Sequence, residues 1–218
     1  MYISRVQLDS LNRRVMRDLK HVGCYHGWIE DSFPEERLQP KEESNRKLWR
    51  IDQVNNKQYL LIVSNNKPDL KKLEKYGVKG SASTKNYDAL LASLQEGMKA
   101  KFKVKLNTVK SLSDRTTHPK RGKVVVVAFK DLPSFFMECA STNGFSINPE
   151  QIRITTSKEL FQHYGENKTS HVHMTFAVAT FDGILTITDL EKFKKALTHG
   201  MGKKKAYGFG MLTVIPCK

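Results

Sequence analysis

A glycine-rich segment near the C-terminus constrains the fold more than any other stretch of this chain. From Gly200 to Gly210 it holds four glycines and three consecutive lysines, and the apolar run Met211–Ile215 follows. Glycine adopts positive φ readily and lets the backbone approach a partner closely. Lysines and open N–H groups bind phosphates. We therefore predict a helix, then a phosphate-facing loop, then a buried strand.

Two known phosphate-binding motifs do not fit this segment. The pattern Gly-x-x-x-x-Gly-Lys-Ser/Thr is absent, and Lys205 stands where the third glycine of Gly-x-Gly-x-x-Gly would be. Both motifs also require the order strand, loop, helix. A helix C-cap followed by a hairpin turn would explain Gly200, but it leaves three lysines among four glycines unexplained. A nucleic-acid backbone is therefore the preferred partner.

The composition agrees with a folded protein that binds a polyanion. Of 218 residues 39% are hydrophobic, and 37 Lys and Arg against 22 Asp and Glu give a net charge of +15. Such a surplus favours nucleic acid over a membrane surface, and no apolar run has the length of a membrane span. The N-terminus lacks a signal peptide's apolar region. Three widely spaced cysteines are typical of reduced cytoplasmic thiols rather than disulfides or a Cys-ligated zinc.

Alternating lysines predict one strand with a basic face. From Lys99 to Leu106 lysine alternates with an apolar residue, and residues 99 to 130 hold ten Lys or Arg against one Asp. A charge run is usually a solvated face. Like charges on one face of a strand are destabilising unless an anion lies near, so we expect this face to bind phosphates. A loop over 111–122 and a buried strand over 124–129 should follow.

The first half of the chain has the order β-α-β-β-α. We expect a strand over 2–8, a helix over 11–20, strands over 48–54 and 58–64, and a helix over 68–76. Ser10 should cap the first helix, with Leu11 on its apolar stripe, and Asn55-Asn56 should form a hairpin turn. Residues 88–94 fit either a helix or an extended segment.

The second half repeats this plan with extra strand length. We expect a helix over 132–141, strands over 151–156, 171–181 and 183–188, a helix over 189–197 capped by Asp189, and the final strand. Two similar halves of this kind indicate an α+β protein made of two tandem ferredoxin-like βαββαβ domains, at residues 1–95 and 96–218.

A candidate catalytic residue lies between the first helix and the polar stretch after it. Residues 21–28, His-Val-Gly-Cys-Tyr-His-Gly-Trp, contain two histidines and two glycines, which predicts an exposed loop of the kind that carries catalytic groups. A lone histidine is more often structural than catalytic. In this loop context we weigh the two roles of His26 equally. A metal site at His171-x-His173 is a weaker hypothesis, because no third ligand has a convincing spacing.

Several groups of residues, spread from end to end of the chain, carry a resemblance. They are Met1–Val6; Arg17-Asp18-Leu19, His26 and Phe33-Pro34; Gly97, Phe102, Leu106-Asn107 and Lys110; Phe181-Asp182-Gly183, Leu185 and Asp189; and Gly200, Gly202, Lys205, Gly208, Gly210 and Leu212. In this combination the sequence resembles the CasE-type CRISPR RNA-processing endoribonucleases, which are subunits of the type I-E Cascade complex. It departs from that family at Thr108, at Lys203-Lys204, and at Gly23, where some members have a helper tyrosine.

The resemblance implies two tandem RRM-like domains that bind the stem-loop of a CRISPR repeat RNA and cut it at the 3′ base of the stem. No metal or other cofactor is implied: the neighbouring 2′-hydroxyl attacks the phosphate, leaving a cyclic phosphate and a 5′-hydroxyl. His26 would be the general acid or base, and Tyr25 takes the helper tyrosine's role. The enzyme would then keep its product and join the other Cascade subunits.

The charge pattern and the resemblance together give the candidate RNA contacts. These are Arg13, Arg17, Lys99, Lys101, Lys103, Lys105, Lys110, Arg115, Lys120, Arg121, Arg153, Lys158, Gly202, Lys203, Lys204, Lys205, Gly208 and Gly210. The alternative is a non-catalytic basic RNA-binding module of RRM type. The aromatic octamer of such modules is not evident in the sequence, and a cleavage assay separates the two hypotheses.

Overall fold

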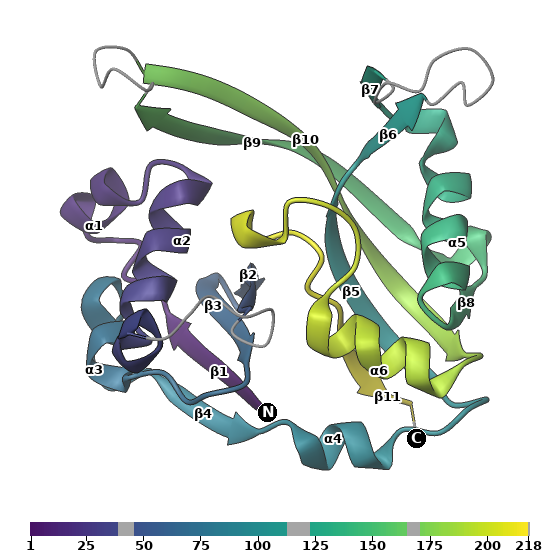
Figure 1. The fold of residues 1–218 in the computed structure, drawn as a ribbon, viewed down its shortest axis with the longest axis horizontal. Coiled ribbons are helices and arrows are strands. Elements are labelled where there is room, and N and C mark those ends of the chain that lie inside the picture. Colours follow the sequence, from purple (N-terminus) through teal and green to yellow (C-terminus); the bar gives the residue numbers. More distant parts are fainter. Residues whose placement is uncertain (39–45, 113–122, 165–170, 218) are drawn as a thin grey trace.

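The computed structural model describes residues 1–38, 46–112, 123–164 and 171–217, and it contains two α+β units (Figure 1). The elements of the first unit are β1 (Tyr2–Gln7), α1 (Arg13–Asp18), α2 (Val22–Asp31), η1 (Pro34–Leu38), β2 (Leu48–Val54), β3 (Lys57–Ser64), α3 (Leu70–Leu73), η3 (Glu74–Tyr76), β4 (Ser83–Asn86) and α4 (Asp88–Ser93). Its antiparallel sheet has the strand order β2-β3-β1-β4, which is the ferredoxin-like order.

The second unit repeats this topology with additions. Its elements are β5 (Lys99–Asn107), β6 (Val109–Leu112), β7 (Lys123–Val126), η4 (Phe129–Asp131), α5 (Leu132–Thr142), β8 (Phe145–Ile147), η5 (Pro149–Gln151), β9 (Arg153–Tyr164), β10 (His171–Ile187), α6 (Leu190–His199), η6 (Lys205–Tyr207) and β11 (Thr213–Pro216). The sheet order is β11-β5-β10-β8, β9 pairs with β10, and β6 pairs with β7. Two tandem ferredoxin-like domains are therefore confirmed; the boundary at residue 95 stays a prediction.

Three local predictions near the N-terminus need correction. Helix α1 is capped by Asn12, whose Oδ1 accepts from the backbone N–H groups of Arg14 and Val15, so Ser10 lies outside the helix. The side chain of Leu11 is 95% exposed and belongs to no apolar stripe. The expected loop at 21–28 is instead the N-terminal part of α2, because burial of Trp28 and its neighbours outweighs the low helix propensity of two glycines.

Two predictions in the second half also need correction. Strand β7 ends at Val126 and, among the described strands, pairs with β6 alone, so the side chains of Val124 and Val126 are exposed rather than buried. Strand β10 runs without interruption through Gly183, which was expected to start a new strand. A Cβ at Gly183 would come within 2.7 Å of the Gln151 carbonyl oxygen, so this glycine allows a close backbone approach.

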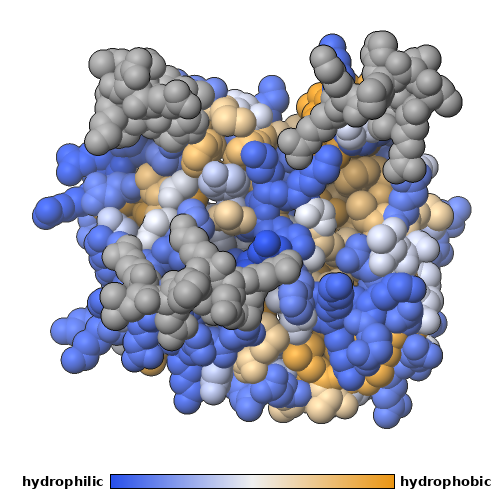
Figure 2. Space-filling model, in the orientation of Figure 1, coloured by the Kyte–Doolittle hydropathy of each residue, from blue (hydrophilic) through white to orange (hydrophobic). Residues whose placement is uncertain are grey.

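Other expected elements are present with small shifts. Asn55 and Asn56 both have positive φ in the β2–β3 turn, and Asp189 caps α6 through its side chain. The helix expected over 68–76 is divided into α3 and η3, and α4 resolves the ambiguity at 88–94 as a helix. Among the described residues, no helix is long and apolar enough to cross a membrane. Hydrophilic side chains dominate the face drawn in Figure 2.

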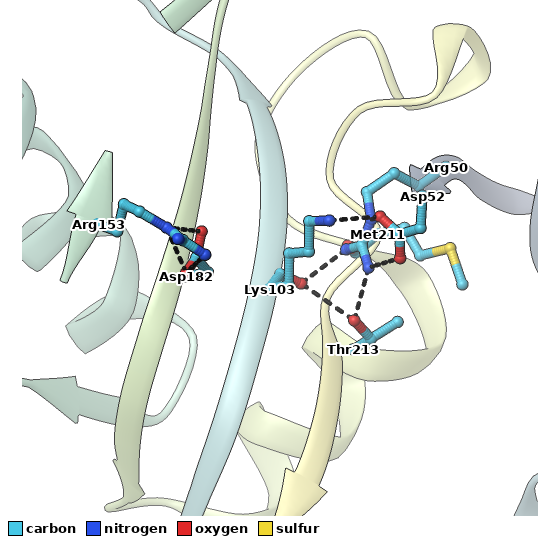
Figure 3. Close-up of polar contacts among 7 residues, drawn as sticks. All are labelled: Arg50, Asp52, Lys103, Arg153, Asp182, Met211 and Thr213. Carbon is cyan, nitrogen blue, oxygen red and sulfur yellow. Dashed lines mark hydrogen bonds and ion pairs between the residues drawn. The ribbon is translucent and has the colours of Figure 1, made fainter. Parts of the chain in front are cut away.

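Strand β2 joins the two units through a buried arginine. The side chain of Arg50 is 2% exposed and donates to the carbonyl oxygens of Lys103 and Met211, at 2.7 and 2.8 Å, and to Thr213 Oγ1 at 2.7 Å (Figure 3). It also forms a bidentate pair with Asp52, which Lys103 Nζ approaches to 2.9 Å. A buried cation whose donors are satisfied from both units fixes their relative position.

Candidate functional site

Helix α2 presents His26 on its open side. Its first turn is capped by His21, whose Nδ1 accepts from the backbone N–H of Gly23 at 3.2 Å. The helix buries Val22, Trp28 and Ile29. The side chain of His26 is consequently 40% exposed and available to a ligand.

Among the residues that the structure describes, side chains from two elements face His26. The ring of Tyr207, in η6, meets the imidazole edge-on with 6.2 Å between ring centroids. Glu30, one turn further along α2, has its Oε1 atom 4.0 Å from His26 Nδ1. Neither neighbour was among the residues selected from the sequence. Tyr207 lies inside the glycine-rich motif, and Glu30 stands four residues after His26, a spacing that has meaning only on a helix.

The glycine-rich loop has the predicted left-handed backbone. Gly200, Gly202, Gly208 and Gly210 all have φ between 71° and 86°, and Lys204 has φ 61°. A non-glycine residue in this region is uncommon, and such residues cluster at active sites and ligand clamps as well as in turns. A Cβ at Gly210 would lie 2.1 Å from the Met201 carbonyl oxygen, so the loop closes tightly on itself.

Consecutive residues of β2 hold this loop at two points. Trp49 Nε1 donates to the Ala206 carbonyl oxygen at 3.0 Å, and Arg50 donates to that of Met211. The Trp49 ring also lies against Gly208, where a Cβ would come within 2.8 Å of it. The first unit therefore fixes the loop of the second unit beside His26.

The three loop lysines have different surroundings. Lys203 is exposed. Lys204 Nζ lies over the rings of Phe176 and Tyr207, 5.5 and 5.9 Å from their centroids. Lys205 Nζ donates to the His199 carbonyl oxygen at 2.9 Å, where a cation satisfies the C-terminal end of α6. Of the three lysines, Lys204 is thus the one that contacts the Tyr207 ring, which His26 also contacts.

Tyr25 and His26 are neighbours in sequence but have different contacts. The Tyr25 ring stacks on Trp49 with 5.7 Å between centroids. Burial, followed by the negative charge of Glu159 and the nearby Cys24, raises the pKa of the Tyr25 hydroxyl. Tyr25 lines a cleft of about 350 Å³ together with Trp49, Lys105, Glu159 and Tyr207. The tyrosine ring that packs on His26 is that of Tyr207.

The basic face of β5 forms as predicted, and part of its charge is balanced within the protein. The side chains of Lys99 and Lys101 are exposed, whereas Lys103 pairs with Asp52 and Lys105 pairs with Glu159. Burial disfavours the charged form of Asp52, but hydrogen bonds and charges of Arg50 and Lys103 outweigh it and lower the pKa of Asp52. The repulsion among the lysines of β5 is therefore partly offset by the carboxylates of Asp52 and Glu159.

The remaining candidate contacts are dispersed. Arg153 forms a bidentate pair with Asp182 across β9 and β10, at 2.8 to 3.2 Å. Besides Arg153, the exposed candidates outside the loop and β5 are Arg13 and Arg17 on α1, Lys110 on β6 and Lys158 on β9. Three candidates lie outside the described residues, namely Arg115, Lys120 and Arg121.

The metal-site hypothesis gains no support from the described part of the chain. His173 Nδ1 lies 3.0 Å from Gln162 Nε2, and the His171 side chain is outside the described residues. Within the ranges that the structure describes, no group of three or more His, Cys, Asp or Glu side chains could hold a metal ion. Cys24, Cys139 and Cys217 are free thiols.

Comparison with solved structures gives similarities over the whole chain. A structure of the CRISPR endoribonuclease Cse3 bound to 19 nt RNA has a TM-score of 0.78 at 20% identity, covering 99% of this chain and 100% of that chain. The CRISPR-associated protein Cas6e from Escherichia coli str. K-12 has a TM-score of 0.65 at 18% identity, and both chains are covered fully, at 100%. A chain of a CRISPR RNA-guided surveillance complex also gives 0.65, at 20% identity and 100% coverage of both chains. At these identities the similarity establishes the fold.

The sequence itself gives one further match. No curated protein matches it significantly. A family model described as CRISPR associated protein matches residues 1–216, almost the entire chain. That match agrees with the fold, with the basic surface and with the glycine-rich loop beside His26. The chain therefore belongs to this family of CRISPR associated proteins.

Proposed function

We propose that this protein is a metal-independent endoribonuclease that binds the stem-loop of a CRISPR repeat RNA and cuts it at the 3′ base of the stem. The 2′-hydroxyl next to the scissile phosphate attacks it, which leaves a cyclic phosphate and a 5′-hydroxyl. The enzyme then stays with its product as a subunit of Cascade in the cytoplasm. The unit at residues 1–95 carries the catalytic histidine, and the unit at 96–218 carries the basic strand and the glycine-rich loop.

The observation that carries this proposal is the position of His26. It is half-exposed on α2, and it faces the glycine-rich loop through Tyr207, over which Lys204 lies. A titratable imidazole beside a cation and a lysine-bearing loop is suited to a phosphodiester. The family match and the likeness to an RNA-bound endoribonuclease and to a surveillance-complex chain agree with this proposal.

The chemistry requires two proton transfers. One proton leaves the attacking 2′-hydroxyl, and another is given to the departing 5′-oxygen. Histidine can perform either transfer near neutral pH, because its unperturbed pKa is about 6.5. Lys204 and Lys203 would offset the charge that develops on the phosphate. Tyr207 would orient the imidazole through its ring contact.

Single-turnover cleavage of a repeat hairpin tests the role of His26. Removing a general acid–base group typically costs about 10²–10⁴ in rate, so His26→Ala should slow cleavage by that factor while hairpin affinity stays nearly unchanged. His21→Ala is the matched control, since His21 caps α2 on its own backbone; it should change the rate much less. Full activity in His26→Ala would remove the site assignment.

A modified substrate tests the reaction itself. A hairpin with 2′-deoxyribose on the 5′ side of the scissile phosphate should bind and stay intact, with or without excess chelator. The unmodified hairpin should be cut equally well in both conditions. Cleavage of the deoxy hairpin would exclude internal 2′-hydroxyl attack. Binding without cleavage of either hairpin would identify the protein as a non-catalytic RNA-binding module.

A further inference from the structure

A buried charged cluster lies behind His26. The side chain of Lys47, which directly precedes β2, is only 5% exposed. Its Nζ lies 2.6 Å from Glu36 Oε2 in η1 and 3.0 Å from Glu30 Oε2 on α2. The Lys47 ammonium also lies over the Phe33 ring, 5.0 Å from its centroid. The second oxygen of Glu30 is the one 4.0 Å from His26 Nδ1.

The described side chains of this cluster hold two carboxylates and one ammonium. Glu36 is 6% exposed, and its Oε1 accepts from Asn66 Nδ2 at 2.9 Å, so it is a fixed counterion for Lys47. Glu30 supplies a second carboxylate to the same ammonium. Among the described side chains of this cluster one ammonium thus faces two carboxylates, and Glu30 Oε1 lies on the side of His26. A protonated imidazole would place a second cation beside Glu30.

We propose that Glu30 is a positioning residue for His26, and that Lys47 anchors Glu30 in that role. This inference rests on the proposed function. The Glu30 carboxylate accepts from Nδ1–H of His26, which turns Nε2 toward the RNA and favours the imidazolium that gives its proton to the leaving 5′-oxygen. Lys47 holds the other carboxylate oxygen, so the Glu30 side chain is fixed rather than free to rotate.

The position of Glu30 agrees with this role. Residues four apart on a helix are neighbours on one face. The 4.0 Å between Glu30 Oε1 and His26 Nδ1 is longer than a hydrogen bond, and catalytic contacts that are long in a free enzyme often tighten when substrate binds. Among the described residues, Tyr207 in η6 also faces His26, with the Lys204 ammonium beyond it. Lys204 disfavours the imidazolium and Glu30 favours it, so removing Glu30 removes a charge that opposes the effect of Lys204.

The first test is the NMR titration of His26 in the free protein, because this readout needs no activity. Loss of a carboxylate at this distance should lower the titration midpoint of His26 by roughly 0.5–1 unit in Glu30→Gln. Glu35→Gln is the matched control, since Glu35 is an exposed carboxylate in η1; its His26 midpoint should stay at the wild-type value. Glu36 still pairs with Lys47 in Glu30→Gln, so the fold should be retained.

The second test is the pH profile of single-turnover cleavage. In Glu30→Gln the alkaline limb should move to lower pH by the same amount, giving a rate loss of about 3–10-fold on that side and little loss on the acidic side. An unchanged His26 midpoint in Glu30→Gln, or an equal change in Glu35→Gln, overturns the inference. If wild-type protein fails to cut the hairpin while the midpoint shift is present, the proposed function fails and the contact between Glu30 and His26 stands.

Discussion

At the scale of single residues, the two histidines of one helix have different roles. His21 accepts a hydrogen bond from Gly23 N–H at the start of α2, which requires an unprotonated Nδ1. Burial, and to a lesser extent the charge of Lys20, lowers the pKa of His21 below its ordinary value of 6.5. His26, one and a half turns later, faces the glycine-rich loop. Sequence position alone does not separate a cap from a candidate catalyst.

The cap makes stability depend on pH. Because the pKa of His21 is lower in the folded than in the unfolded chain, its contribution to stability is complete above pH 6.5 and is lost as pH falls below that value. His21→Ala should lose about 1 kcal/mol of unfolding free energy at pH 7.5 and lose less than wild type on acidification to pH ~5.5. Urea denaturation at both pH values measures this. His21→Asn should retain the cap, and its stability should lose the sensitivity to acid. If either variant at position 21 kept the wild-type change of stability with pH, His21 would not be the source of that change.

The sequence identified His26 but not the groups around it. The sequence predicts a loop over 21–28, and the spacing of four between His26 and Glu30 makes them neighbours only on a helix. Lys47 is a single lysine next to a polar stretch, and only the folded chain brings it within 3.0 Å of Glu30. Tyr207 was inside a recognised motif, but its ring contact joins residues 181 positions apart, which no local pattern encodes.

At the scale of elements, the glycine-rich loop depends on β2 for its shape. Gly202 and Gly208 both have positive φ, at 73° and 83°. Their surroundings differ: a Cβ at Gly208 would meet the Trp49 ring at 2.8 Å, whereas one at Gly202 would meet only Leu106, at 3.5 Å. The two positions therefore allow backbone strain to be separated from steric overlap in the loop.

Matched valine substitutions test this support. Gly202→Val and Gly208→Val should each lose about 1–2 kcal/mol of unfolding free energy to the left-handed backbone. Gly208→Val should lose about 1–3 kcal/mol more, because it overpacks against Trp49, and it should bind a repeat hairpin less tightly. Thermal denaturation and filter binding measure the two effects. Equal stability of the two variants, or wild-type hairpin binding by Gly208→Val, would refute the proposed support.

Local patterns predicted the elements best where one face of an element is buried. The alternation from Lys99 to Leu106 identified β5, because a strand with one buried face repeats every two residues. The prediction of a strand break at Gly183 was wrong, because this glycine allows the close approach of the Gln151 carbonyl oxygen and does not end the strand. The prediction of a buried strand was also wrong for β7, whose apolar residues lie on a two-stranded ladder outside the main sheet.

At the scale of the whole molecule, the order of elements predicted two ferredoxin-like units but not how they interlock. The hydrogen bonds that Arg50 donates to the second unit join residues 53 to 163 positions apart in the chain. Phe176 and Phe209 of the second unit pack in the core beneath α2, and Leu48 of the first unit packs in the core of the second. These contacts depend on tertiary structure, and they decide which lysines of β5 pair with the protein's own carboxylates.

The ion pairs of Lys103 and Lys105 lead to a specific prediction for how RNA affinity depends on salt concentration. With a net charge of +15, affinity for a repeat hairpin should fall with salt at a log–log slope of about −4 or steeper, as phosphate neutralisation releases counterions. Replacing exposed Lys99 and Lys101 by Gln should flatten the slope by about 1.4–1.8, the value for two phosphates. Replacing ion-paired Lys103 and Lys105 removes the same formal charge but should flatten it less. A flat wild-type slope, or equal flattening by both pairs, would show that this face does not bind RNA as proposed.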